Sequence, residues 1–170
     1  MLTADEIIEF LSLQPLPVEG GYFRQTYRAT ESVSASSLPA RYGRDKPFCT
    51  AIYYVLTSDP DSFSALHRLP SDEIYHVYLG DPVEMLLLYP DGKSAVVGLG
   101  PDLQAGQRMQ FVVPAGVWQG SRLAAGGTFA LLGTTMAPGY GEADYTGGER
   151  GALSEHYLDR GDLIRELTRE

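Results

Sequence analysis

One segment contains both candidate functional side chains and a turn between two predicted strands, Phe63-Ser-Ala-Leu-His-Arg-Leu-Pro-Ser-Asp-Glu-Ile-Tyr-His-Val-Tyr-Leu-Gly80. It holds two of the three histidines of the protein and a carboxylate between them. Residues 70–72, which are Pro, Ser and Asp, favour a turn between two strand-like runs. Side chains alternate along a strand, so His67 and Glu73 each share a face with their second neighbours. The segment therefore predicts two consecutive strands that carry an imidazole and a carboxylate.

A three-residue turn of this kind predicts a hairpin in which His67 lies opposite Tyr75 and Leu69 lies opposite Glu73. His67 and Glu73 are then diagonal neighbours on one face, a separation that long side chains bridge. By the same alternation His76 points to the other face. We expect the function of the protein on the surface where His67 and Glu73 converge.

Length, composition and charge narrow the class of protein. With 170 residues, 44% hydrophobic and 21% charged, we expect a single globular domain spanning residues 1–170. The net charge of −9 and the lack of a Lys/Arg cluster argue against nucleic acid and anionic membranes as partners. The chain has no signal-like N-terminus and no bilayer-spanning apolar run, and its one cysteine fits a reducing compartment. We expect a cytoplasmic protein.

Short strand-like runs separated by turn residues occupy most of the chain. They lie at residues 17–27, 50–56, 83–89, 94–97, 110–113, 117–123 and 128–135. Helical signals are confined to the two ends, with a capping box at Thr3 and Glu6 and an apolar helical spacing over 157–168. Residues 31–47, rich in Ser, Arg, Gly and Pro, predict a surface loop. The pattern favours an all-β sandwich or barrel with one N-terminal and one C-terminal helix.

The spacing around the hairpin resembles the first motif of the cupin superfamily, which is Gly-x5-His-x-His-x3,4-Glu-x6-Gly. His67, Glu73 and the closing glycine fit this frame, and Leu69 stands in place of the second histidine. Residues 114–116, Pro-Ala-Gly, match the start of the second motif. After two intervening residues, Gln119 stands where the superfamily has its last histidine.

A more specific resemblance is to the domain of unknown function 985 family, a group of small single-domain cupins. It rests on six segments: Glu19–Arg24, Ala51–Tyr54, Phe63–Arg68, Ser71–His76, Val113–Gln119 and Ala137–Tyr140. The resemblance covers nearly the whole chain and implies a double-stranded β-helix, which is an open-mouthed jelly-roll barrel, in a homodimer. It implies no particular activity, because a fold does not specify a function.

The same resemblance raises the question of a metal. Cupins that bind Mn, Fe or Ni usually use three imidazoles and a carboxylate, and the matching positions here are His67, Leu69, Glu73 and Gln119. Leucine cannot ligate, and a neutral amide oxygen is a weak ligand for a transition metal. We therefore expect no metal and no other cofactor. If a divalent metal did bind, in a metal-dependent cupin enzyme, its ligands would be His67, Glu73 and Gln119.

A second reading is an enzyme that needs no metal. Leu66-His67 resembles the Leu-His of the sugar-nucleotide 3,5-epimerases, in which the matching histidine removes a proton beside a carbonyl and a tyrosine returns one. The resemblance implies His67 as base, oriented by Glu73, and Tyr75 or Tyr54 as acid. The alternative is a hydrogen bond between His67 and Glu73 in a binding pocket without turnover.

The interpretation that we favour is a non-catalytic binder of a small polar molecule, for instance a sugar derivative. Barrel mouths with few polar groups among apolar and aromatic walls suit such ligands. We expect His67, Glu73, Tyr75 and Gln119 to line the pocket, and Arg24 or Arg68 to meet an anionic group of the ligand.

Three aromatic positions are expected to face away from this pocket. Because side chains alternate between the two faces of a strand, Trp118 points to the face opposite Gln119. His76 and Tyr78 likewise point to the face opposite Glu73. We expect them to pack on the outer surface of the sheets or in a dimer interface.

Overall fold

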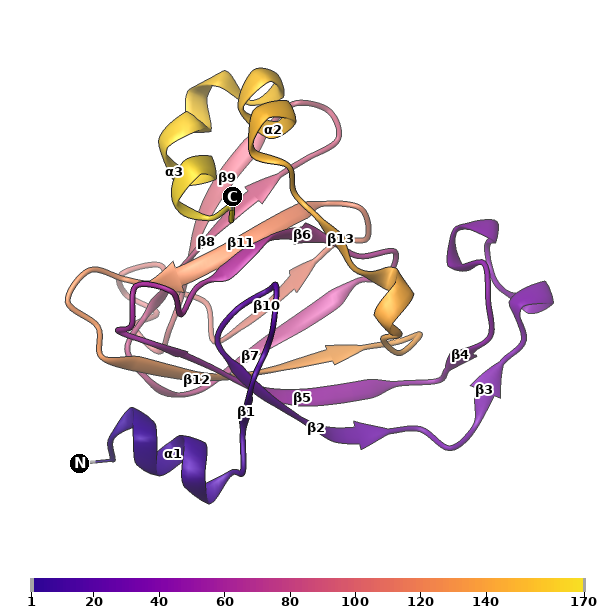
Figure 1. Cartoon of the computed structure of the whole chain (residues 1–170), viewed down its shortest axis with the longest axis horizontal. Helices are drawn as coiled ribbons and strands as arrows, with labels where there is room; N and C mark the ends of the chain where they lie inside the picture. The colour runs from indigo at the N-terminus through magenta and orange to yellow at the C-terminus, as the bar shows by residue number, and fades with distance from the viewer. Residues whose placement is uncertain (1, 170) are drawn as a thin grey trace.

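The computed structural model describes residues 2–169, and in them two antiparallel β-sheets face each other (Figure 1). The large sheet contains, in spatial order, β1 (Gln14–Pro15), β2 (Tyr22–Arg28), β5 (Thr50–Thr57), β12 (Phe129–Met136), β7 (Glu73–Gly80) and β10 (Gln110–Val113). The small sheet contains β13 (Thr146–Gly147), β6 (Ser64–Arg68), β11 (Trp118–Leu123), β8 (Val83–Leu88) and β9 (Ser94–Leu99). The prediction of an all-β jelly-roll barrel is confirmed.

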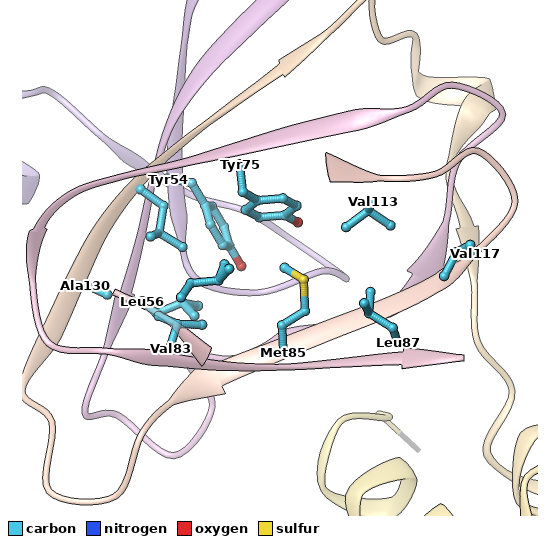
Figure 2. Packing of buried hydrophobic residues seen from close by; sticks show 11 residues of the cluster. Tyr54, Leu56, Tyr75, Val83, Met85, Leu87, Val113, Val117 and Ala130 are labelled. Atoms are coloured by element: carbon cyan, nitrogen blue, oxygen red, sulfur yellow. The ribbon is translucent and has the colours of Figure 1, made fainter. Parts of the chain in front are cut away.

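The core fills the space between the two sheets. Alternation along β8 turns Val83, Met85 and Leu87 inward, and all three are almost completely buried. Figure 2 shows Tyr54 and Tyr75 of the large sheet pointing across this space toward Met85 of the small sheet. Complete burial of one such aliphatic side chain contributes about 1.5–3 kcal/mol. The inward-facing tyrosines bring hydroxyl groups into an otherwise apolar interior.

The N-terminal helix packs on the outer face of the large sheet. The capping box predicted at Thr3 and Glu6 is confirmed, and it starts α1 (Ala4–Phe10). Ile7 is the buried residue of this helix, and it packs with Val55 and Leu131 of the large sheet. One buried residue in two turns is enough to hold this short helix on the sheet, because the N-terminal cap and the packing both stabilise it.

The C-terminal segment covers the outer face of the small sheet (Figure 1). It consists of α2 (Arg150–His156), η4 (Leu158–Arg160) and α3 (Gly161–Glu166). The helical prediction over 157–168 is confirmed by α3, whereas α2 was not predicted, because its only buried residue, Leu153, gives no periodicity. Leu86 and Leu88 of β8 pack against these helices, and Trp118 lies partly buried beside them.

The surface-loop prediction for residues 31–47 is wrong in part. This segment forms a two-stranded ribbon of β3 (Ser32–Val33) and β4 (Lys46–Pro47), with η1 (Ala35–Ser37) and η2 (Ala40–Tyr42) at its tip. Figure 1 shows the ribbon extending from one side of the barrel. Tyr42 and Lys46 are buried, so a segment with a loop-like composition nevertheless contributes to the packed interior.

The predicted hairpin between the strands of His67 and Glu73 is also wrong. β6 belongs to the small sheet and pairs with β11 and β13, whereas β7 belongs to the large sheet and pairs with β12 and β10. The turn at residues 69–72 therefore carries the chain from one sheet to the other. Alternation fixes which side chains of a strand share a face. It does not show which strand pairs with which, because strand pairing depends on long-range topology. His67 and Glu73 still reach a common interior space, because the inner faces of the two sheets oppose each other.

Candidate functional site

A cavity of about 490 Å³ lies between the inner faces of the two sheets, and we call it the barrel cavity. Its volume falls within the range of small-molecule sites. Its polar lining is Glu19, Gln25, Arg28, Thr50, Tyr54, His67, Glu73, Tyr75, Thr134, Tyr140 and Glu142. Its remaining lining, mostly apolar, is Leu16, Pro17, Phe23, Ala51, Ile52, Leu69, Met136 and Gly141.

His67 is fixed in one tautomer by the backbone of its own strand. The side chain is 2% exposed, and its Nδ1 lies 2.8 Å from the carbonyl oxygen of Ala65. A carbonyl oxygen only accepts, so Nδ1 carries the hydrogen and donates it. In the neutral ring Nε2 then holds a lone pair. The ring also stacks on Tyr145, with centroids 5.2 Å apart and planes 19° apart, so its orientation is held from two sides.

Glu73 is held by an amide from the opposite sheet. Gln119 pairs with His67 in the ladder between β11 and β6, and its Nε2 donates a 2.7 Å hydrogen bond to Oε2 of Glu73. Both residues are buried, which makes a hydrogen bond to a charged acceptor strong. Oε1 of Gln119 is buried without a partner among the described residues. Gln119 therefore links the imidazole strand to the carboxylate.

The two inward tyrosines keep their protons. Burial, first of all, raises the pKa of Tyr75 well above its ordinary value, and the nearby negative charge of Glu73 raises it further. Burial likewise raises the pKa of Tyr54, whose hydroxyl donates to the carbonyl oxygen of Gly20 at 2.9 Å. Both phenols are therefore neutral hydrogen-bonding groups at physiological pH.

Glu19 is a site residue that sequence reasoning missed. It lines the barrel cavity, and Oγ of Ser64 donates to its Oε1 at 3.1 Å. Burial of the carboxyl group raises its pKa; His67 lowers it and Glu73 raises it again to smaller extents. The available signal was its place before Gly20 and Gly21 in one of the family-like segments.

The Gly20-Gly21 pair brings the Glu19 turn against the small sheet. The sequence predicts a bulge or a close backbone approach at this pair, and the close approach is confirmed. A Cβ on Gly20, whose φ is 101°, would lie 2.2 Å from the carbonyl oxygen of Phe63. The amide of Ala65 donates to the carbonyl of Glu19 at 2.7 Å, which ties the turn to β6.

The segment after β12 forms one wall of the barrel cavity. Nη1 of Arg28 donates to the carbonyl oxygen of Tyr140 at 3.1 Å, and the Tyr140 amide donates to Oγ1 of Thr50 at 2.9 Å. Burial raises the pKa of Tyr140 and of Tyr145 to about 12. These residues place two further neutral phenols beside the cavity and its histidine.

The structure brings His67, Glu73 and Tyr75 to the same cavity and places Gln119 behind Glu73. Arg24 lies elsewhere, contrary to the sequence expectation. Its guanidinium sits 5.9 Å from the ring centroid of Tyr53, on the outer face of the large sheet. The reason is strand alternation, which turns Phe23 inward and Arg24 outward.

The donor set does not fit the metal site of metal-binding cupins. Leu69, at a ligand position, lines the cavity with an aliphatic side chain, and one oxygen of Glu73 is occupied by the Gln119 amide. Over residues 2–169, His, Cys, Asp and Glu form no group of three or more placed to hold a metal ion. Softer metals prefer imidazole or thiolate donors, and here only His67 supplies one.

A comparison with protein-family models matches residues 5–147 to the cupin superfamily family described as DUF985. The chain belongs to this cupin family. It is 31% identical over 137 residues to "Uncharacterized protein YML079W" of Saccharomyces cerevisiae, a match that covers 75% of this chain and 67% of the yeast protein.

Solved structures agree with the family assignment. A hypothetical protein from Leishmania major superposes with a TM-score of 0.87 at 29% identity, covering 99% of this cupin and 100% of that chain. Protein SO0799 from Shewanella oneidensis gives 0.86 at 31% identity, covering 99% of each chain. Oxalate decarboxylase from Bacillus subtilis gives 0.53 at 14% identity over 93% of this chain and 37% of that one, which shows the shared fold alone.

The helices of this cupin are short. Within residues 2–169, none has both the length and the apolar character needed to cross a membrane.

Proposed function

We propose that the barrel cavity binds a small, uncharged, hydroxyl-rich molecule, such as a sugar derivative, and that this binding is the function of the protein. The observation that carries the proposal is the convergence of His67, Glu73 and Tyr75 on one cavity of suitable size. The lone pair of His67 Nε2 and the carboxylate accept hydrogen bonds, and the phenol donates one. Hydroxyl groups of a ligand both donate and accept, so they match this mixed set.

The charges around the cavity favour a neutral ligand. Glu19, Glu73 and Glu142 line it, against one guanidinium from Arg28. Burial raises the pKa of the Glu19 carboxyl, which means that a negative charge is already unfavourable at this position. A negatively charged ligand group beside it would add to that cost. An anionic ligand body is therefore disfavoured deep in the cavity.

The test is isothermal titration calorimetry against a panel of neutral monosaccharides and polyols, with the corresponding sugar acids as charged counterparts. We expect saturable binding of at least one neutral compound and weaker binding of its acid. His67→Ala should weaken that binding by about 10-fold or more, because a buried hydrogen bond is lost. His76→Ala is the matched control, since His76 bonds Gln110 and Thr135 outside the cavity.

Two results would contradict the proposal. One is equal binding by the wild type and the His67→Ala variant. The other is tighter binding of the sugar acids than of the neutral sugars throughout the panel.

A second candidate function, a metal-independent isomerase or epimerase, is favoured by the fixed tautomer of His67. In such a step Nε2 takes a proton from a carbon beside a carbonyl, the C–H electron pair moves to form an enolate, and an acid returns a proton to carbon. The two tyrosines predicted as the acid do not suit this step well. The pKa of Tyr75 is raised well above its ordinary value, and Tyr54 already donates to Gly20, so neither phenol is well matched to proton donation near neutrality.

Solvent deuterium exchange separates the two candidates. Binding alone predicts no deuterium at carbon when a bound sugar or sugar nucleotide is incubated in heavy water. Incorporation that is lost in His67→Ala would instead support the isomerase.

We also propose that this function needs no resident metal, because at the ligand positions of the cupin motifs Leu69 and the Gln119–Glu73 hydrogen bond leave one imidazole and a partly occupied carboxylate. Elemental analysis of the purified protein checks this. A stoichiometric transition metal that disappears in His67→Ala would overturn it.

A further inference from the structure

A second hollow, with a volume of about 660 Å³, lies beside the barrel cavity and carries three arginines. Arg41 comes from η2, Arg44 follows η2, and Arg68 ends β6. The three come from two segments that are far apart in the sequence. We call this hollow the arginine groove. Leu69 lines both the groove and the barrel cavity, so the two sites are neighbours.

The three guanidinium groups have no carboxylate partner among the described residues. The ion pairs of residues 2–169 involve other cations. Asp144 also lines the groove, but it is buried against Lys46 and accepts from the amide of Gly141. Three like charges gathered around one hollow repel each other unless an anion compensates them.

Two acidic side chains close in sequence to the groove wall accept hydrogen bonds from backbone amides. Oδ1 of Asp45, the residue after Arg44, accepts one from the amide of Ala35 at 2.8 Å. Oδ1 of Asp72 accepts a 2.8 Å hydrogen bond from the amide of Ala115, which itself lines the groove. This protein carries a net charge of −9, so a local excess of positive charge is a distinct feature of this surface.

Two of the guanidinium groups lie over aromatic rings, and that of Arg41 also donates from Nη2 to the Tyr42 hydroxyl at 3.3 Å. Arg41 lies 4.7 Å from the ring centroid of Tyr42, and its Nε donates to the carbonyl oxygen of Pro70 at 2.9 Å. Arg68 lies 4.7 Å from the ring centroid of Trp118. Stacking engages the face of a guanidinium and leaves in-plane N–H groups for other acceptors. It also reduces the entropy lost when those groups bind a ligand.

We infer that the arginine groove is an anion site that binds a phosphate group. Guanidinium groups match phosphate oxygens by paired, charge-assisted hydrogen bonds, and a dianion compensates several cations at once. The inference goes beyond the proposed function, because it adds a second site with a ligand chemistry opposite to that of the acidic barrel cavity. The phosphate comes either from free phosphate or from a phosphorylated small molecule.

The experiment is calorimetric titration of the full chain with inorganic phosphate, inorganic pyrophosphate and ribose 5-phosphate at fixed ionic strength. Arg44→Gln and Arg68→Gln should each weaken binding by about fivefold. Arg108→Gln is the control, because it removes an exposed arginine from outside the groove. His67→Ala should leave phosphate binding unchanged, so a failure of the barrel-cavity proposal stays distinguishable from a failure of this one.

Tighter binding of ribose 5-phosphate than of inorganic phosphate would support the site and identify a phosphate ester as its ligand. Equal binding would support the site with free phosphate as the ligand. The inference is overturned if none of the three probes binds the wild type, or if Arg108→Gln weakens binding as much as the two groove variants do.

Discussion

Glu19 and His67 are two titratable residues that line the barrel cavity. His67 donates from Nδ1 to Ala65, which leaves Nε2 as an acceptor. Burial raises the pKa of Glu19 and so favours its protonated form, which can donate a hydrogen bond. At the scale of single residues, the cavity therefore combines an oriented imidazole, a carboxyl group that favours its protonated form and one firmly held carboxylate, Glu73, and its lining also includes Arg28 and Glu142.

The raised pKa of Glu19 predicts a pH-dependent stability. The folded protein holds this proton more tightly than the unfolded chain, whose carboxyl titrates near 4.5. The favourable contribution is therefore complete below pH 4.5 and is lost as the pH rises through the folded pKa. Glu19→Gln should be more stable than the wild type at pH 7, with a difference that shrinks toward pH 4.5. Urea unfolding at both pH values measures this, and a difference independent of pH would contradict it.

Residue identity in the cavity could be predicted only where a local pattern exists. His67, Glu73 and Tyr75 were predicted because alternation and motif spacing mark them. Arg24 was misplaced because the inward face of its strand cannot be chosen from alternation alone, and Glu19 was missed because a single glutamate in a turn carries no periodic signal.

At the scale of elements, the ribbon of β3 and β4 locks the cavity wall in place. Lys46 of β4 pairs with Asp144, and side-chain exposures of 1% and 3% show that this pair is buried. Asp144 in turn accepts from the amide of Gly141, a residue that lines the barrel cavity. The ribbon thereby reaches the site although it lies at the side of the barrel in Figure 1.

Removing only the lysine of this ion pair should lower the free energy of unfolding. Lys46→Met leaves a buried carboxylate without its cation and should destabilise the protein by about 3–5 kcal/mol. The double variant Lys46→Met/Asp144→Leu removes both charges and should recover most of that loss. Unfolding in guanidinium chloride of the wild type, Lys46→Met, Asp144→Leu and the double variant measures the coupling. Equal loss in the single and double variants would show that packing, rather than the charge pair, holds the wall.

Element positions were easier to predict than element partners. The runs at 50–56 and 128–135 predict strands, and the structure has them at 50–57 and 129–136, with a ladder that is regular along its whole length. The turn at residues 69–72 looked like a hairpin, but it connects the two sheets. Local propensity defines a strand, whereas its neighbour is chosen by the packing of the whole barrel.

At the scale of the whole molecule, the outer face of the large sheet is the best candidate for a self-association surface. Tyr53 and Tyr78 meet edge to face at 5.9 Å, and His76 stacks parallel to Tyr78 at 6.4 Å. Tyr78 is 49% exposed, and Val112 on the neighbouring strand is 46% exposed. We propose that the protein is a homodimer through this face, since aromatic groups with polar ends suit interfaces.

The dimer proposal predicts the effect of a charge at the centre of this face. Tyr78→Arg should convert the dimer to a monomer, because two cations would meet across a two-fold interface. Leu158→Arg is the control, since Leu158 is 84% exposed on the C-terminal segment. Size-exclusion chromatography with light scattering measures both masses. A monomeric wild type, or a dimer that survives Tyr78→Arg, would contradict the proposal.

The most direct measurement is a crystal structure of the protein with the neutral sugar or polyol that binds best in calorimetry. We predict that the ligand occupies the barrel cavity with a hydroxyl group within hydrogen-bond distance of His67 Nε2, whether or not the arginine groove also holds a ligand. We also predict that the hydrogen bond between Gln119 and Glu73 is retained. A ligand bound outside the barrel, with only solvent around His67, would contradict the prediction.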